Sequence, residues 1–236
     1  MDSLGDRMKE FYENRTRYAV PRRTYTIIRI DGKAFHSYTR GLKRPFDDKL
    51  MEDLDETTKF ICKEIQGTKL AYVQSDEISL VLTDFDDLST DAWFDGNIQK
   101  MASVSASLAT GKFNELRPGK LAFFDSRVFT IPYLGEVENY LLWRQNDASR
   151  NSVSAVAQSL YSQKELSGKK CDQMQEMIFQ KGINWNDYAS RYKRGRMIVK
   201  ESYDKNGADR NRWSLVEIPV FSQDKNFLKK YLTVIE

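Results

Sequence analysis

Cysteine is scarce in this sequence, and long apolar runs are missing. The 236 residues contain two cysteines, Cys62 and Cys171, which are too few for a disulfide framework and lack the spacing of zinc ligands. No stretch approaches the roughly 18 apolar residues of a membrane-spanning helix. The first residues, Met1 to Asp6, do not combine a basic region with an apolar one, so no signal peptide is predicted. We therefore expect a protein of a reducing, cytoplasmic compartment without a membrane segment.

Histidine and the glycine-rich phosphate loops are also missing or rare. His36 is the only histidine, and no nucleophile stands in an obvious relation to it, so a serine or cysteine triad has no support. A lone histidine is more often a packed or hydrogen-bonded loop residue than a catalyst. Neither Gly-x-x-x-x-Gly-Lys-Ser/Thr nor Gly-x-Gly-x-x-Gly occurs, which removes the grounds for a P-loop or Rossmann enzyme.

The composition supports one large domain, or one core with an appended lobe. Hydrophobic residues make up 40% of the chain and aromatic residues 12%, enough for a substantial core. The net charge of +3 says little, but its distribution is uneven. A late basic cluster is interleaved with tyrosines, which suits either a phosphate backbone or a solvated face. Its candidate RNA-binding residues are Arg191, Lys193, Arg194 and Arg196.

The first 134 residues have the pattern of a split βαβ unit. A short helix is expected over 3–14, with Ser3 as its N-cap and an apolar stripe. The next elements alternate between β-branched runs and helical periodicity. They are a strand at 24–30, a helix at 47–66, a hairpin at 69–83, a helix at 94–116 and a strand at 121–132. The order βαββαβ predicts an α+β, ferredoxin-like fold whose antiparallel sheet carries helices on one face.

The remaining residues form a different pattern, which begins near Leu134. Helices are predicted at 137–163 and 170–181, followed by a turn or short helix at 184–188. A terminal hairpin is predicted from 197–203 and 213–219, joined across Asp204 to Gly207. We interpret 1–134 as a catalytic core and 135–236 as a mostly helical lobe with a β-hairpin, packed as one unit with the core.

Three carboxylates lie where predicted strands end. Asp31 follows the first strand, and Asp76 and Glu77 stand at the tip of the hairpin. If the hairpin lies beside the first strand, these acids converge and can hold a divalent metal, as phosphoryl or nucleotidyl transfer requires. Gly32 leaves room for a phosphate, and Lys33 adds a positive charge. The alternative is a solvated turn, which is common for Asp-rich tips.

Several motifs occur in a fixed order along the chain. They are Ile30–His36, Gln74–Glu77, Phe124–Val128 and Trp143–Asp147, accompanied by Gly5–Glu13 and Tyr192–Gly195. This series resembles the tRNA(His) guanylyltransferase family, whose enzymes extend RNA in the 3′-to-5′ direction. The match covers nearly the whole chain, and the Asp-Gly-x-x-Phe-His and Ser-Asp-Glu elements together are specific.

The resemblance implies a polymerase-type palm with a two-metal site. It implies that two Mg²⁺ ions are held by Asp31, the carbonyl of Gly32 and Asp76. Glu77 is expected to be a supporting catalytic carboxylate, since its side chain points opposite to that of Asp76 if both are extended. Nucleotide binding is implied along Asp31, Gly32, Lys33, Ala34, Phe35 and His36, and at Ser75 and Asp76.

The resemblance also implies the reaction and its partners. ATP activates a 5′-monophosphate end of tRNA, and the 3′-hydroxyl of an incoming nucleotide such as GTP then attacks that end and releases AMP. A homotetramer is implied as well. Two other classes stay open on the residues alone: a nucleotidyl cyclase with a palm domain, and a non-catalytic RNA-binding module.

One segment departs from the family pattern. Where the eukaryotic enzymes continue into His-Ile-Asn-Asn-Leu-Tyr-Asn, this chain has Ser149–Ala155, in which only Asn151 clearly remains. The sequence in this respect is similar to the guanylyltransferase-like branch of bacteria and archaea. That branch is implied to repair 5′-truncated tRNAs by templated addition, rather than to add G to tRNA(His) without a template.

Overall fold

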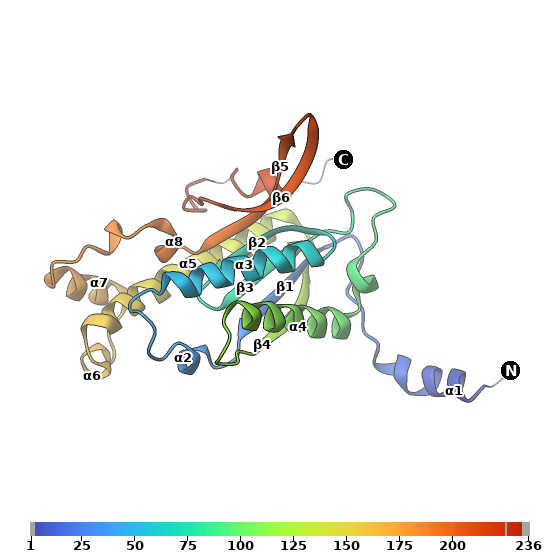
Figure 1. Cartoon of the computed structure of the whole chain (residues 1–236), viewed down its shortest axis with the longest axis horizontal. Coiled ribbons are helices and arrows are strands. Elements are labelled where there is room, and N and C mark those ends of the chain that lie inside the picture. Colours follow the sequence, from blue (N-terminus) through green and yellow to red (C-terminus); the bar gives the residue numbers. More distant parts are fainter. Residues whose placement is uncertain (1–2, 225, 233–236) are drawn as a thin grey trace.

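A computed structural model describes residues 3–224 and 226–232 (Figure 1). Its centre is one six-stranded sheet with the order β4-β1-β3-β2-β5-β6, in which every neighbouring pair is antiparallel. The strands are β1 (Tyr25–Gly32), β2 (Thr68–Gln74), β3 (Glu77–Leu82), β4 (Phe124–Ile131), β5 (Arg196–Lys205) and β6 (Ala208–Val216). The α+β, ferredoxin-like prediction is confirmed.

Helices cover both faces of the sheet, because alternate side chains of each strand point to opposite sides. Ile28 and Ile30 pack under α3 (Asp48–Glu64) and α4 (Ile98–Leu116). Ile27 on the same strand packs against the long helix α5 (Leu134–Leu160) and the C-terminal segment that includes α9 (Lys229–Leu232). The one-face prediction therefore holds for α3 and α4, whereas α5 covers the opposite face.

Shorter elements complete the fold. A third apolar cluster joins the end of α5 to helices beyond it. These elements are α6 (Gln163–Leu166), α7 (Cys171–Gln180) and the 3-10 helix η3 (Trp185–Asp187), and the short helix α8 (Ser190–Lys193) follows them. Two elements precede the first strand in sequence: α1 (Leu4–Phe11) and the 3-10 helix η1 (Glu13–Thr16). Two more lie in the connections between strands: α2 (Phe35–Tyr38) and the 3-10 helix η2 (Trp93–Gly96).

The terminal hairpin belongs to the central sheet. Strand β5 pairs with β2, in a register that places Arg196 opposite Val73. The sheet therefore contains strands from both halves of the chain. The turn residues Asn206 and Gly207 both have positive φ, which suits a tight hairpin turn. The two strands reach this turn at Lys205 and Ala208, whereas the predicted strands stopped at 203 and began at 213. The division at residue 134 stays a prediction, and this pairing explains why the two parts would pack as one unit.

Two local predictions were wrong in detail. The helix predicted from Phe94 starts at Ile98, because Phe94 and Asp95 adopt left-handed backbone angles and the Asn97 side chain caps the helix by accepting from Lys100 N. The helix predicted over 3–14 spans only Leu4–Phe11, and its apolar stripe is not buried. It stays exposed in a helix that projects from the body (Figure 1), through Leu4, Met8, Phe11 and also Tyr12 just beyond it.

Candidate active site

The predicted acids meet at one edge of the sheet. Asp31 is near the end of β1, where it pairs in register with Asp125 of β4. On the other side, Ile30 pairs with Ile78 of β3, and Ser75 and Asp76 form the turn between β2 and β3. Continuing that register brings Gly32 beside Asp76. Because antiparallel neighbours lie about 5 Å apart, the structure places Asp31 and Asp76 at the same edge.

This edge concentrates negative charge. The pKa of Asp76 is raised to about 6, mainly by burial and also by the charges of Asp31 and Glu77, and a hydrogen bond of 2.9 Å from Ser75 Oγ opposes this shift. The nearest cation to Asp31 is Arg127, with Nη2 at 4.0 Å from Oδ2 and 3.8 Å from Asp125. Converging carboxylates of this kind are stabilised when a cation binds between them.

Glu77 turns toward α5. Its carboxylate accepts a hydrogen bond of 2.8 Å from Nε of Arg144, whose side chain is only 6% exposed. Arg144 also donates to Asp147 at 2.6 Å. The motif Trp143–Asp147 carried no assigned role in the sequence, and the spacing of three residues between Arg144 and Asp147 is the signal that both lie on the same face of a helix. Glu77 is thus held by a buried ion pair beside the acidic turn.

The loop after β1 is shaped by aromatic packing. The ring of Phe35 is buried and lies 4.9 Å from the ring centre of Tyr38 and 5.2 Å from that of Phe124. Ala34 has a left-handed conformation with φ of 55°, and the Lys33 amide donates to Phe123 O at 2.8 Å. Lys33 and His36 are exposed, so the predicted nucleotide-binding segment presents these two side chains and buries Phe35.

Gly32 is required by this packing. A Cβ atom on Gly32 would lie 2.2 Å from the Phe35 ring, far inside van der Waals contact. We expect Gly32→Ala to lower the free energy of unfolding by about 1–3 kcal/mol, as overpacking does. Chemical denaturation of Gly32→Ala, Phe35→Leu and the double variant would measure this. The double variant should lose less than the sum of the single losses; additive losses would contradict a clash with the ring.

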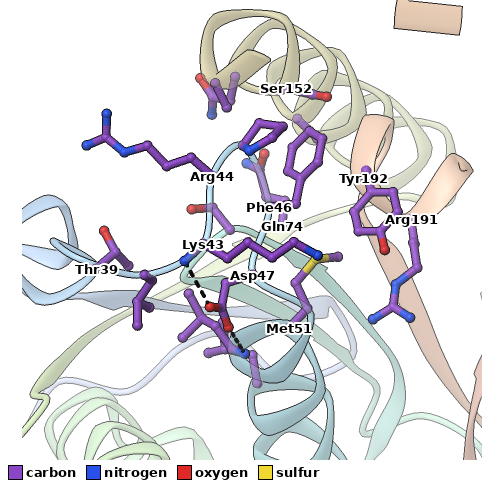
Figure 2. Close-up of a pocket in the computed structure, with 18 of the residues that line it drawn as sticks. Thr39, Lys43, Arg44, Phe46, Asp47, Met51, Gln74, Ser152, Arg191 and Tyr192 are labelled. Atoms are coloured by element: carbon purple, nitrogen blue, oxygen red, sulfur yellow. Dashed lines mark hydrogen bonds between the residues drawn. The ribbon is translucent and has the colours of Figure 1, made fainter. Parts of the chain in front are cut away.

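A cavity of about 330 Å³ opens beside the acidic edge (Figure 2). His36, Gln74 and Ser75 line it on the side of the acids. Its other walls come from segments that are far apart in sequence: the loop 42–47, the start of α3, the middle of α5, and the region of Arg191 to Arg196. The sequence did not identify this loop as part of the site. Asp47 holds it in place, since its carboxylate accepts from the amides of Lys43 at 3.2 Å and Leu50 at 2.8 Å (Figure 2).

The basic cluster 191–196 is not a solvent-facing stripe. Lys193 is buried with its ammonium donating to Asn186 O, and Arg196 is buried against Asp55. Their burial keeps these two side chains off any solvent-facing RNA-binding surface. Arg191 lines the cavity, and Arg194 is half-buried beside Trp185. An RNA-binding role for Arg191 and Arg194 stays a prediction.

The donor set at the edge suits a hard cation. In the described ranges, no group of three or more His, Cys, Asp or Glu side chains is arranged to hold a metal ion. The predicted metal ligands include only two side chains, those of Asp31 and Asp76, and the third ligand is the backbone carbonyl of Gly32. Carboxylate and carbonyl oxygens are the ligands that Mg²⁺ accepts, usually with several waters. The raised pKa of Asp76 fits the same assignment.

The antiparallel palm-like sheet, the acidic edge and the adjoining cavity are the arrangement expected of a nucleotidyltransferase. The family model described as tRNAHis guanylyltransferase matches residues 5–132. A solved bacterial tRNA(His) guanylyltransferase-like protein in complex with ATP is 46% identical, with a TM-score of 0.89 over 98% of this chain and 99% of its own. The chain belongs to the tRNAHis guanylyltransferase family.

Two further relatives are more distant. The tRNA(His) guanylyltransferase of Candida glabrata is 28% identical over 75% of this chain and 83% of its own length. The solved enzyme of Saccharomyces cerevisiae, 24% identical with a TM-score of 0.69 over 92% of this chain and all of its own, shares the fold. Within the part of the chain that the structure describes, no helix is long and apolar enough to cross a membrane.

Proposed function

We propose that this enzyme repairs 5′-truncated tRNA by templated addition of nucleotides in the 3′-to-5′ direction. The observation that carries this proposal is the 46% identity, over nearly the full length, to the bacterial guanylyltransferase-like protein. The departure at Ser149–Ala155 points the same way, since the segment expected for non-templated G addition to tRNA(His) is replaced.

The acidic edge is the proposed catalytic centre. Asp31, Asp76 and the Gly32 carbonyl would hold two Mg²⁺ ions, and Glu77 would support the turn. When bound, the metal lowers the pKa of an attacking hydroxyl and neutralises charge on the leaving group. ATP and GTP are the proposed nucleotides, because related structures of the bacterial protein hold each of them.

The chain's own residues would then position the substrates. The exposed ammonium of Lys33 offers a point charge to a triphosphate, while Ser75 and His36 lie between the acids and the cavity. The cavity would accommodate the nucleoside, for which Phe46 and Leu50 offer apolar contacts. Catalysis of this kind depends mainly on position and electrostatics.

The pKa of Asp76 predicts a pH dependence of the metal-free protein. Its folded-state value of about 6 lies above the ordinary 3.8, so the protonated form stabilises the fold. This contribution is present below pH 4 and is lost as the pH rises through 6, at about 1.4 kcal/mol per pKa unit. Thermal melts in EDTA at pH 5 and 7.5 should therefore differ more for the wild type than for Asp76→Asn. Equal differences would contradict the shift.

Self-association is also proposed. The exposed apolar stripe of α1 is available for contact with another copy, and the proposed assembly is a homotetramer in the cytoplasm. Light scattering would give the mass in solution, and Met8→Ser with Phe11→Ser should lower it. An unchanged tetramer would remove α1 from the interface.

The decisive experiment compares two RNA substrates. A 5′-truncated tRNA and a full-length tRNA(His) lacking its extra G would compete for labelled GTP in the presence of ATP and Mg²⁺. Preference for the truncated tRNA is expected, and preference for tRNA(His) would overturn templated repair. Formation of a cyclic nucleotide without RNA would instead indicate a cyclase. Tight tRNA binding without Mg²⁺-dependent incorporation would indicate a binding module.

A further inference from the structure

The cavity wall contains buried polar atoms that the protein does not satisfy. Among the described residues, Nε and Nη2 of Arg191, Nη2 of Arg196 and Oε1 of Gln74 are buried without a hydrogen-bond partner. All three residues line the cavity. Leaving a buried donor or acceptor unpaired is costly, and more so for a charged group, so such atoms in one cavity indicate a ligand that pairs with them.

Arg196 is fixed in place. It is 3% exposed, stands opposite Val73 in the sheet and donates from Nε to Asp55 of α3. The residue before it, Gly195, has φ of +79°, and a Cβ there would lie 2.4 Å from the hydroxyl oxygen of Tyr72. The strand therefore sits tightly against β2, and the arginine cannot swing out to solvent. Its Nη2 is a buried donor without a partner.

Arg191 approaches the same wall from α8. Its guanidinium lies 5.5 Å from the ring centre of Tyr192, and that ring stacks on Phe46 at 4.9 Å. The Tyr192 hydroxyl donates to Asp48. Figure 2 shows Arg191 and Tyr192 side by side on one side of the cavity. The carboxylates near the two arginines are Asp48 and Asp55, and each already accepts a hydrogen bond.

We propose that Arg191 and Arg196 form an anion subsite that binds a phosphate group of a substrate, apart from the metal-binding edge. Two guanidinium groups offer several N–H donors, which match phosphate oxygens. Gln74 Oε1 is an acceptor, so it would take a hydroxyl or amine of the same ligand, and this favours a nucleotide over free phosphate. The identity of the substrate rests on the proposed function. The phosphate belongs either to a nucleoside triphosphate or to the 5′ end of the RNA.

Binding of tripolyphosphate in EDTA tests the subsite without metal. We expect calorimetry to show at least about tenfold weaker binding for Arg191→Gln than for the wild type, with Arg191→Lys between them. Arg210→Gln is the matched control, since it removes the same charge from an exposed residue of β6 outside the cavity. Equal affinities of Arg191→Gln and Arg210→Gln, with both variants folded by thermal melt, would overturn the subsite.

Two further titrations identify the source of the phosphate. If it comes from a nucleotide, Arg191→Gln weakens ATP binding and leaves RNA binding unchanged. If it comes from the RNA, the variant loses the preference of the wild type for a 5′-phosphorylated over a 5′-hydroxyl tRNA. If Arg191→Gln keeps both its ATP affinity and its preference for 5′-phosphorylated tRNA, the proposal is overturned. Arg196 is unsuitable as the test residue, because its removal leaves Asp55 buried and unpaired. Wild-type extension of tRNA is scored separately, so failure of the subsite leaves the proposed function standing.

Discussion

Replacement of Asp31 or Asp76 by asparagine should abolish nucleotide addition to tRNA. Asparagine keeps the size of the side chain and one oxygen, but it removes the charge that a divalent cation needs. A bound metal supplies several kcal/mol of charge stabilisation in the transition state, so a loss of about 4 kcal/mol corresponds to roughly 1000-fold in kcat/KM. Incorporation of labelled GTP into a 5′-truncated tRNA at saturating Mg²⁺ would measure it.

A neighbouring acid provides the control for this prediction. Asp125 pairs with Asp31 across β1 and β4, contacts the same Arg127, and has a side chain that is 58% exposed. Asp125→Asn should therefore change kcat/KM less than about threefold, the scale of a screened surface charge. Asp76→Asn should not melt below the wild type in EDTA, because burial already disfavours its charge. Near-normal addition by Asp31→Asn or Asp76→Asn would remove them from the catalytic centre.

The local patterns of the sequence predicted the strands and the acidic edge. Alternating and β-branched runs located β1 and the β2–β3 hairpin. Asp31 and Asp76 were then selected because an acidic residue at the end of a predicted strand can be recognised from the sequence alone. The contact between Glu77 and Arg144 was not predicted, because contacts between α5 and the hairpin depend on packing between segments almost 70 residues apart.

Other features required the three-dimensional structure. A cluster of basic residues looks the same in sequence whether it is solvated or buried, so the burial of Lys193 and Arg196 could not be predicted. The cavity is built from four separate segments and has no signature in any of them. Gly32 was interpreted as leaving room for phosphate, whereas the structure shows that the ring of Phe35 fills the position of its missing side chain.

Arg144 should be the most sensitive residue outside the acidic edge. Its side chain is 6% exposed and pairs with Glu77 and Asp147, so its removal leaves Glu77 as a carboxylate that is only 12% exposed and has lost its cation. We expect Arg144→Met to lower the free energy of unfolding by about 3 kcal/mol, the scale for breaking a buried ion pair. Because Glu77 adjoins the turn that carries Asp76, kcat/KM should fall as well. Urea denaturation and the tRNA extension assay would measure the two effects.

Arg150 distinguishes the buried pair from an ordinary surface bridge. It lies on the same helix and also donates to Asp147, at 2.9 Å, but its side chain is 55% exposed. Arg150→Met should therefore cost less than about 1 kcal/mol. If the loss in Arg144→Met comes from an unpaired Glu77, then adding Glu77→Gln should recover at least about 1 kcal/mol of stability, since the stranded charge is gone. Activity should stay low in that double variant, because neutralising Glu77 does not restore the contact that holds the hairpin tip against α5. Equal losses for Arg144→Met and Arg150→Met would show that the ion pair does not position the acidic turn.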